Sequence, residues 1–266
     1  MNIRSAKIND KNIRYSIEGE GAIIVLLHGF VECIEIWEQF SCKLSKTNKV
    51  ICIELPGHGE SEIISEVQTM EIMAEHVHKL INTIISEKYV LIGHSMGGYI
   101  GLSFAEKYEN ELVGLGLFHS NAIADTPEAK LGRERAAEII KLNKENYIFN
   151  FIPNLFAECN RETFATEIIW LQEKAKSLTK EALISCLFGM KERTDKISFL
   201  IDTNLPIMFI AGKEDERSPL NSLIAQAMLP KHSEILILSN CGHTGYIEKE
   251  TETLEFIRDF ARKAFL

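Results

Sequence analysis

One short turn at residues 93–97, Gly-His-Ser-Met-Gly, constrains the fold more than any other feature of the sequence. The apolar run Tyr89–Ile92 before it predicts a buried strand, and apolar residues at helical spacing follow it over residues 102–108. A strand that passes directly into a helix needs a sharp turn, and glycines on both sides leave room for the backbone. The serine between them then lies at the tip with an exposed hydroxyl, facing the positive end of the helix. We therefore predict that Ser95 is a nucleophile.

The turn is part of a repeating order of apolar runs and amphipathic segments. Residues 3–17 alternate as a β-hairpin does, and Ala22–Leu27 is an unbroken apolar run, typical of a strand buried on both faces. Further strands are expected at residues 50–53, 112–118, 207–211 and 234–238, with helices near residues 36–44, 67–86, 220–228 and 251–265. This alternation predicts an α/β fold with an eight-stranded, mostly parallel sheet and helices on both faces.

The alternation stops between residues 122 and 203, where only helical patterns occur. Candidate helices follow Thr126, with Pro127 in the first turn, and run near residues 147–156, 162–178 and 180–191. Many of these residues are bulky and apolar, so we expect a helical cap inserted after the sixth strand. The core domain would then comprise residues 1–121 and 204–266. The alternative is that these helices pack against the core without covering a site.

Composition narrows the possible partners. The 266 residues carry a formal net charge of −9, which argues against nucleic acid and against an anionic membrane surface. No run of about 18 apolar residues is long enough to cross a bilayer. The six cysteines form no Cys-x-x-Cys pair, so we expect neither a metal nor another cofactor. Without an export signal we expect a cytoplasmic protein. The expected partner is a small-molecule substrate, and the expected oligomeric state is a monomer or a homodimer.

A serine hydroxyl needs a base, and the base needs an acid to orient it. Among the eight histidines, His243 is the best candidate because it follows the last predicted strand, and in this kind of fold the histidine comes last. Asp215 follows the preceding strand and is the predicted acid. Glu214 beside it is the main rival, and Asp202 is a weaker one.

Acyl transfer also needs N–H donors for a developing oxyanion. We predict the backbone N–H groups of Met96, directly after the nucleophile, and of Phe30, in the loop after the strand at residues 22–27. The tentative substrate pocket comprises four further side chains: His28, His94, His119 and Trp170. His119 ends a strand, and the interpretations of a substrate contact and of a locally bonded hinge residue are both open.

With these residues assembled, the chain resembles the α/β-hydrolase superfamily, specifically the small bacterial serine hydrolases and esterases that carry a cap. The resemblance covers nearly the whole chain and rests on five motifs: His28-Gly29-Phe30, Pro56–Ser61, Gly93–Gly98, the loop ending in Asp215, and Gly242-His243. It implies a triad of Ser95, Asp215 and His243. Relatives that cleave carbon–halogen bonds or epoxides carry Asp at the position of Ser95, so the resemblance argues against both activities.

Three functions agree with these residues. The first is hydrolysis of a small, partly hydrophobic carboxylic ester through an acyl-enzyme on Ser95. The second uses the same triad on a carbon–carbon bond or a thioester, or in a lyase step; Lys130, Arg133 and Arg135 could bind an acidic substrate, but charges at this spacing usually form a solvated helix face. The third is a receptor for a small ligand, without catalysis.

Overall fold

The computed structural model describes residues 1–266 and contains a single eight-stranded sheet in the order β1-β2-β4-β3-β5-β6-β7-β8. β2 pairs antiparallel with both β1 and β4, and all the other neighbours are parallel. The strands are β1 (Ile3–Ile8), β2 (Lys11–Glu18), β3 (Ile23–Leu27), β4 (Lys49–Ile53), β5 (Tyr89–His94), β6 (Leu112–Phe118), β7 (Ile207–Gly212) and β8 (Ser233–Leu238). The predicted α/β fold is confirmed.

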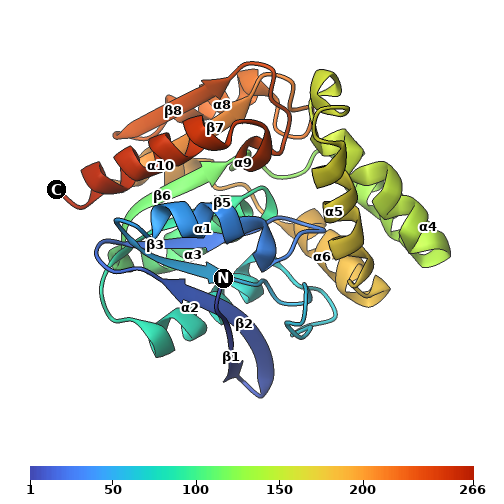
Figure 1. Ribbon diagram of the computed structural model, residues 1–266, viewed down its shortest axis with the longest axis horizontal. Helices are drawn as coiled ribbons and strands as arrows, with labels where there is room; N and C mark the ends of the chain where they lie inside the picture. Colours follow the sequence, from blue (N-terminus) through green and yellow to red (C-terminus); the bar gives the residue numbers. More distant parts are fainter.

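Helices cover both faces of this sheet, as the apolar strands require. Every residue of β3, β5 and β7 is buried, so neither face of these strands meets water. In Figure 1, α1 (Glu38–Leu44) and α10 (Glu250–Ala264) lie in front of the sheet, while α3 (Met96–Tyr108) and α8 (Leu220–Ala227) lie behind it. α2 (Met70–Ile84) packs on α3, and the short α9 (Gly245–Glu248) packs on α10.

The chain between β6 and β7 is helical, as predicted, and lies at one end of the sheet (Figure 1). α4 packs against both α5 and α6. Its N-terminus is capped by the side chain of Thr126, which accepts the N–H of Ala129, and Pro127 occupies the first turn. The helices of this segment are α4 (Pro127–Phe151), α5 (Ala165–Lys176), α6 (Lys180–Glu192) and α7 (Ile197–Asp202). The division into a core domain and a cap domain stays a prediction.

The helix predicted near residues 147–156 is present but ends earlier than expected. α4 consists of two helices that meet at Asn143, where φ is −152° and ψ is 88°, and the second of them contains residues 147–151. The side chain of Asn143 accepts the N–H of Asn146 at 3.0 Å and so caps this second helix. The helix ends at Phe151 because Pro153 follows, and residues 153–155 form one turn of 3₁₀ helix. The apolar spacing continued past the true end of the helix, whereas the proline set the boundary.

The register of the parallel strands brings the candidate loops together. Leu27 lies opposite Gly93, and His94 lies opposite Phe118, so the loops after β3, β5 and β6 leave the sheet side by side. The loop after β7 leaves at the same edge, because Phe118 pairs with Ile210 near the end of β7. A pocket at this carboxyl edge is the usual place for a ligand in an α/β sheet.

None of the helices is both long enough and apolar enough to cross a membrane. The cytoplasmic location stays a prediction.

Candidate active site

Ser95 lies at the tip of the turn between β5 and α3, with φ of +51° and ψ of −115°. Its N–H donates to the carbonyl of Phe118 at 2.9 Å, which fixes the turn to β6. A Cβ atom on Gly93 would lie 2.1 Å from the carbonyl oxygen of Gly97, so no larger residue fits there. The turn therefore holds Ser95 in a backbone conformation that is strained for a residue other than glycine.

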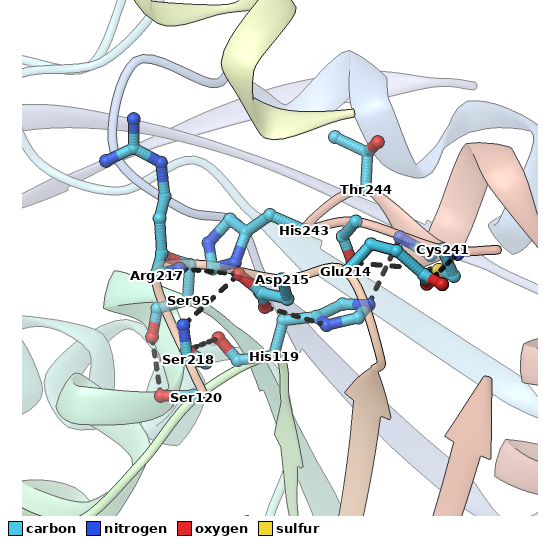
Figure 2. Close-up of polar contacts among 12 residues, drawn as sticks. Ser95, His119, Ser120, Glu214, Asp215, Arg217, Ser218, Cys241, His243 and Thr244 are labelled. Carbon is cyan, nitrogen blue, oxygen red and sulfur yellow. Dashed lines mark hydrogen bonds and ion pairs between the residues drawn. The ribbon is translucent and has the colours of Figure 1, made fainter. Parts of the chain in front are cut away.

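Asp215, in the loop after β7, has a buried carboxylate that accepts four hydrogen bonds. Oδ2 accepts the Nδ1–H of His243 at 2.8 Å and that of His119 at 3.1 Å, while Oδ1 accepts the backbone N–H groups of Arg217 and Ser218 (Figure 2). Burial by itself would raise the pKa of Asp215, but the contacts with His243 and His119 outweigh it and hold the pKa below its ordinary value. Asp215 is therefore a carboxylate at neutral pH.

The hydrogen bonds also assign the histidine tautomers. Nε2 of His119 accepts the N–H of Gly245 at 3.2 Å, so the proton of this ring is on Nδ1, facing Asp215. His243 directs Nδ1 at the same carboxylate, which leaves its Nε2 as the basic atom. Burial lowers the pKa of His243 to about 4, even though Asp215 acts to raise it. The imidazole is therefore neutral at pH 7 and able to accept a proton.

Ser95 and His243 line the same cavity, which has a volume of about 590 Å³. No hydrogen bond joins the hydroxyl of Ser95 to His243 in this structure. Contacts of this kind are often long in free enzymes and shorten when substrate binds.

The two predicted oxyanion donors flank Ser95. The N–H of Met96 is the first of α3, where a helix has no internal acceptor, and the N–H of Phe30 has no hydrogen-bond partner. The loop that carries Phe30 approaches Ser95 closely: a Cβ atom on Gly29 would lie 3.1 Å from the Cβ of Ser95. Both N–H groups are therefore without an acceptor beside Ser95, and their role as oxyanion donors stays a prediction.

The structure also identifies a residue that the sequence interpretation missed, Glu32. Its carboxylate accepts the N–H of Gly29, the hydroxyl of Tyr246 at 2.8 Å and Nδ1 of His94 at 2.9 Å. Nε2 of His94 faces the carbonyl oxygen of His243 at 2.8 Å, so both ring nitrogens have acceptors and the imidazolium form satisfies both.

The pKa values of this pair agree with its geometry. Burial lowers the pKa of His94, but Glu32 outweighs it and the pKa is raised. Burial raises the pKa of Glu32, but His94 outweighs it and the pKa falls to about 2. The pair ties the loop of Phe30 to the turn that carries Ser95. Nothing in a single sequence indicates that Glu32 turns inward.

Three of the four tentative pocket residues do not line the cavity, which corrects that expectation; His94 does line it. His28 is fully buried and links two loops, because its Nε2 accepts the N–H of Leu55 at 2.9 Å. His119 is fully buried behind Asp215. Trp170 lies on α5 and is 36% exposed, outside the cavity lining. His28 and His119 each follow a buried strand and are themselves buried, so their nearness to the site in sequence did not place their side chains in the cavity.

The rival acids lie elsewhere. Glu214 is exposed and accepts the N–H of Cys241 at 2.8 Å, and Asp202 is exposed at the end of α7. His119, Asp215 and His243 each place one possible metal-ligand atom within 4.8 Å of the others. Hydrogen bonds account for this proximity, because each histidine directs an N–H at Asp215.

The arginines change another expectation. Arg133, expected on a solvated helix face, lines the cavity together with Arg193 and Arg217. Arg135 is exposed and lies outside it, as expected. Helical spacing separates the two residues onto different faces of α4, and only the packing of α4 decides which face meets the cavity.

A sheet of this topology, with a serine turn after β5 and a buried Asp–His pair after β7 and β8, defines a class of hydrolases. The model of the α/β hydrolase fold family matches residues 22–158. The chain belongs to this family and is a hydrolase.

Particular relatives support the assignment. A thermophilic esterase from Thermogutta terrifontis, whose structure was solved with malate bound, is 32% identical, with a TM-score of 0.90 over 95% of this chain and 94% of that one. The mouse (Mus musculus) monoacylglycerol lipase ABHD6 is 23% identical over 98% of this chain and 82% of that protein. The chloroplastic protein PHYLLO of Arabidopsis thaliana is 30% identical over 52% of this chain, but the match spans only 8% of PHYLLO.

Proposed function

We propose that this hydrolase cleaves a small, partly hydrophobic carboxylic ester, with Ser95 as nucleophile, His243 as base and Asp215 as the residue that orients His243. The observation that carries the proposal is that Ser95 and His243 line one cavity while Nδ1 of His243 is bonded to buried Asp215. This arrangement leaves the basic Nε2 for the serine hydroxyl.

In the first half-reaction, Oγ of Ser95 attacks the carbonyl carbon of the ester and its proton moves to Nε2 of His243. The carbonyl oxygen becomes an oxyanion that accepts the N–H groups of Phe30 and Met96. When the intermediate collapses, the carbon–oxygen bond to the alcohol breaks and the alcohol takes the proton from His243. An acyl group then remains on Ser95.

In the second half-reaction, water attacks the acyl carbon and gives a proton to His243. The bond to Oγ of Ser95 breaks, Oγ takes that proton, and the carboxylic acid leaves. Asp215 keeps its negative charge throughout and stabilises the imidazolium in both intermediates.

The helical segment supports an ester with an apolar portion. Phe151, Leu155, Leu187 and Met190 line the cavity from this segment. We propose that residues 122–203 act as the cap over the site. The esterase from Thermogutta terrifontis matches nearly the whole chain, which supports ester cleavage ahead of carbon–carbon or thioester cleavage.

The test is turnover of p-nitrophenyl acetate and p-nitrophenyl butyrate by the protein and by Ser95→Ala. We expect the substitution to lower the rate by at least about 10³-fold, because nucleophile and base act as a unit. Equal rates in both proteins would remove Ser95 from the mechanism. Labelling with a fluorophosphonate distinguishes an enzyme from a non-catalytic receptor. If the native protein neither reacts with the probe nor cleaves either ester, the receptor function is favoured instead.

A further inference from the structure

The cavity beside Ser95 contains an unusual share of the arginines of the protein. The chain has nine arginines and a net charge of −9, yet Arg133, Arg193 and Arg217 all line this one cavity and no lysine does. We call these three residues the arginine cluster. The planar guanidinium group suits carboxylates, with which it forms two parallel hydrogen bonds, whereas lysine acts as a point charge.

Two of the three arginines share one carboxylate. Asp125, at the start of the helical segment, accepts Nη1 of Arg193 at 2.6 Å and Nη2 of Arg133 at 3.2 Å. Arg193 also lies 4.1 Å from the ring centre of Tyr99. One negative charge therefore faces two positive charges, and the group keeps a net charge of +1.

Arg217 has no such partner. Its guanidinium lies 4.0 Å from the ring centre of Phe151, and it forms no side-chain hydrogen bond or ion pair. Glu216 also lines the cavity but is not paired with it. The aromatic ring of Phe151 holds the cation by a cation–π contact and leaves the N–H groups at the edge of the guanidinium available.

Tyr147 adds a neutral donor to the same wall. Its ring stacks on Phe151 at 5.2 Å, and its hydroxyl has no hydrogen-bond partner in the chain. Burial raises the pKa of Tyr147 to about 12, although Arg217 and Arg133 act to lower it. The hydroxyl therefore keeps its proton at neutral pH and can donate it to an anion.

We propose that Arg217, assisted by Tyr147 and by the excess positive charge of the group formed by Arg133, Arg193 and Asp125, binds a carboxylate group carried by the substrate itself. The substrate class is then an ester with a second, free carboxylate, such as a monoester of a small dicarboxylic acid. This inference rests on the proposed function and specifies its substrate. The cavity of about 590 Å³ is of the size that encloses a small molecule.

The main test compares monoethyl glutarate with the neutral ester ethyl hexanoate, measured as ethanol release. The quantity compared is the preference, defined as kcat/KM for the charged ester divided by kcat/KM for the neutral one. We expect a preference above tenfold in the native protein. Arg217→Met should lower this preference by about 10- to 100-fold, because a charged hydrogen bond is lost. Arg217→Lys should lower it by less, because lysine keeps the positive charge.

Arg135→Met is the matched control, because Arg135 is an exposed arginine of α4 outside the cavity. It should keep the native preference. A general loss of activity lowers kcat/KM for both esters and therefore cancels in the ratio. The side chain of Arg217 is also not hydrogen-bonded to Asp215, which accepts only the backbone N–H of Arg217. A preference near one in the native protein, or one unchanged in Arg217→Met, would overturn the inference while ester hydrolysis by Ser95 stands.

Calorimetric titration with glutarate measures the same site without turnover, so it decides the inference even if neither ester is cleaved. Glutarate should bind the native protein and bind Arg217→Met at least tenfold more weakly. Equal binding by the two proteins contradicts the inference. Tighter binding of inorganic phosphate than of glutarate also contradicts it and would indicate a phosphorylated ligand.

Discussion

Two groups of ionisable residues lie beside one cavity, and they differ in how completely their polar atoms are paired within the protein. The histidine cluster consists of His94, His119 and His243 with Glu32 and Asp215. Both of its carboxylates are buried and accept several hydrogen bonds from within the protein. The arginine cluster has one internal carboxylate, Asp125, for three cations.

The difference agrees with the roles that we propose for the two groups. A triad must hold its geometry before substrate arrives, so its polar atoms are already bonded and little rearrangement is needed during the reaction. A binding site must keep bonding capacity for the ligand, and an unpaired guanidinium at a cavity wall provides it. Substitutions in the histidine cluster should therefore change rate or stability, whereas those in the arginine cluster should change substrate preference.

The largest effect is expected at Asp215. Asp215→Asn removes the charge that orients and stabilises the ring of His243, and in a serine-protease triad this change lowers kcat by about 10⁴-fold. Ester turnover is the measurement. Glu214→Gln, at the neighbouring exposed carboxylate, is the control and should keep nearly the native rate. A similar loss of turnover in both variants would mean that any substitution in this loop lowers the rate and that the charge of Asp215 is not the cause.

A smaller effect, on stability, is expected at Glu32. Glu32→Gln removes one partner of a buried ion pair, and such changes lower the free energy of unfolding by about 3–5 kcal/mol. Urea unfolding measures it. Glu60→Gln removes an exposed partner of Arg14 and should change the stability little. An unchanged stability in Glu32→Gln would show that the pair does not hold the loop.

The same pair predicts how stability varies with pH. Because the pKa of His94 is raised in the folded protein, its contribution is complete below the unfolded value of 6.5 and is lost as the pH rises through the folded pKa. Glu32, with its pKa lowered to about 2, contributes above its unfolded value of 4.5 and loses the contribution toward pH 2. The alkaline decline should disappear in Glu32→Gln.

The pH profile of catalysis should show the burial of His243. Only its neutral form accepts the proton of Ser95, so kcat/KM should fall about tenfold per pH unit below the pKa of His243. That pKa is about 4, so the acid limb should lie well below the ordinary histidine value of 6.5. A midpoint at or above 6.5 would mean that Asp215 outweighs the burial of the ring.

The smallest effect is expected at Phe151, which supports Arg217 without contacting the reacting atoms. Phe151→Leu keeps an apolar side chain but removes the ring beneath the guanidinium. Loss of one such contact should reduce the preference for monoethyl glutarate by about two- to fivefold. If the preference is unchanged, the ring only fills space and Arg217 is positioned by other contacts.

The sequence predicted the sheet, the turn at Ser95 and the places of the hydrogen-bonded Asp215 and His243, because these depend on short motifs with fixed places in the chain. The turn at Ser95 needs its glycines, and the loops with Asp215 and His243 each follow an apolar strand. The predicted end of the helix at residue 156 was wrong, because apolar spacing alone does not show where a helix ends. His28 and His119 were misplaced in the pocket because nearness in sequence does not show which side of a loop a side chain occupies. Trp170 was misplaced because an apolar pattern does not show whether α5 meets the cavity.

By itself, the sequence determined the order of strands and helices, the strained turn at Ser95 and the positions of Asp215 and His243 along the chain. Those features follow from local backbone geometry and from the period of apolar residues. Only the tertiary structure decided that Glu32 bonds His94 and that Arg217 stands unpaired over Phe151. These contacts join residues 62 and 66 positions apart. The first depends on how the loop after β3 lies against the end of β5, and the second on how the helical segment packs on the sheet edge.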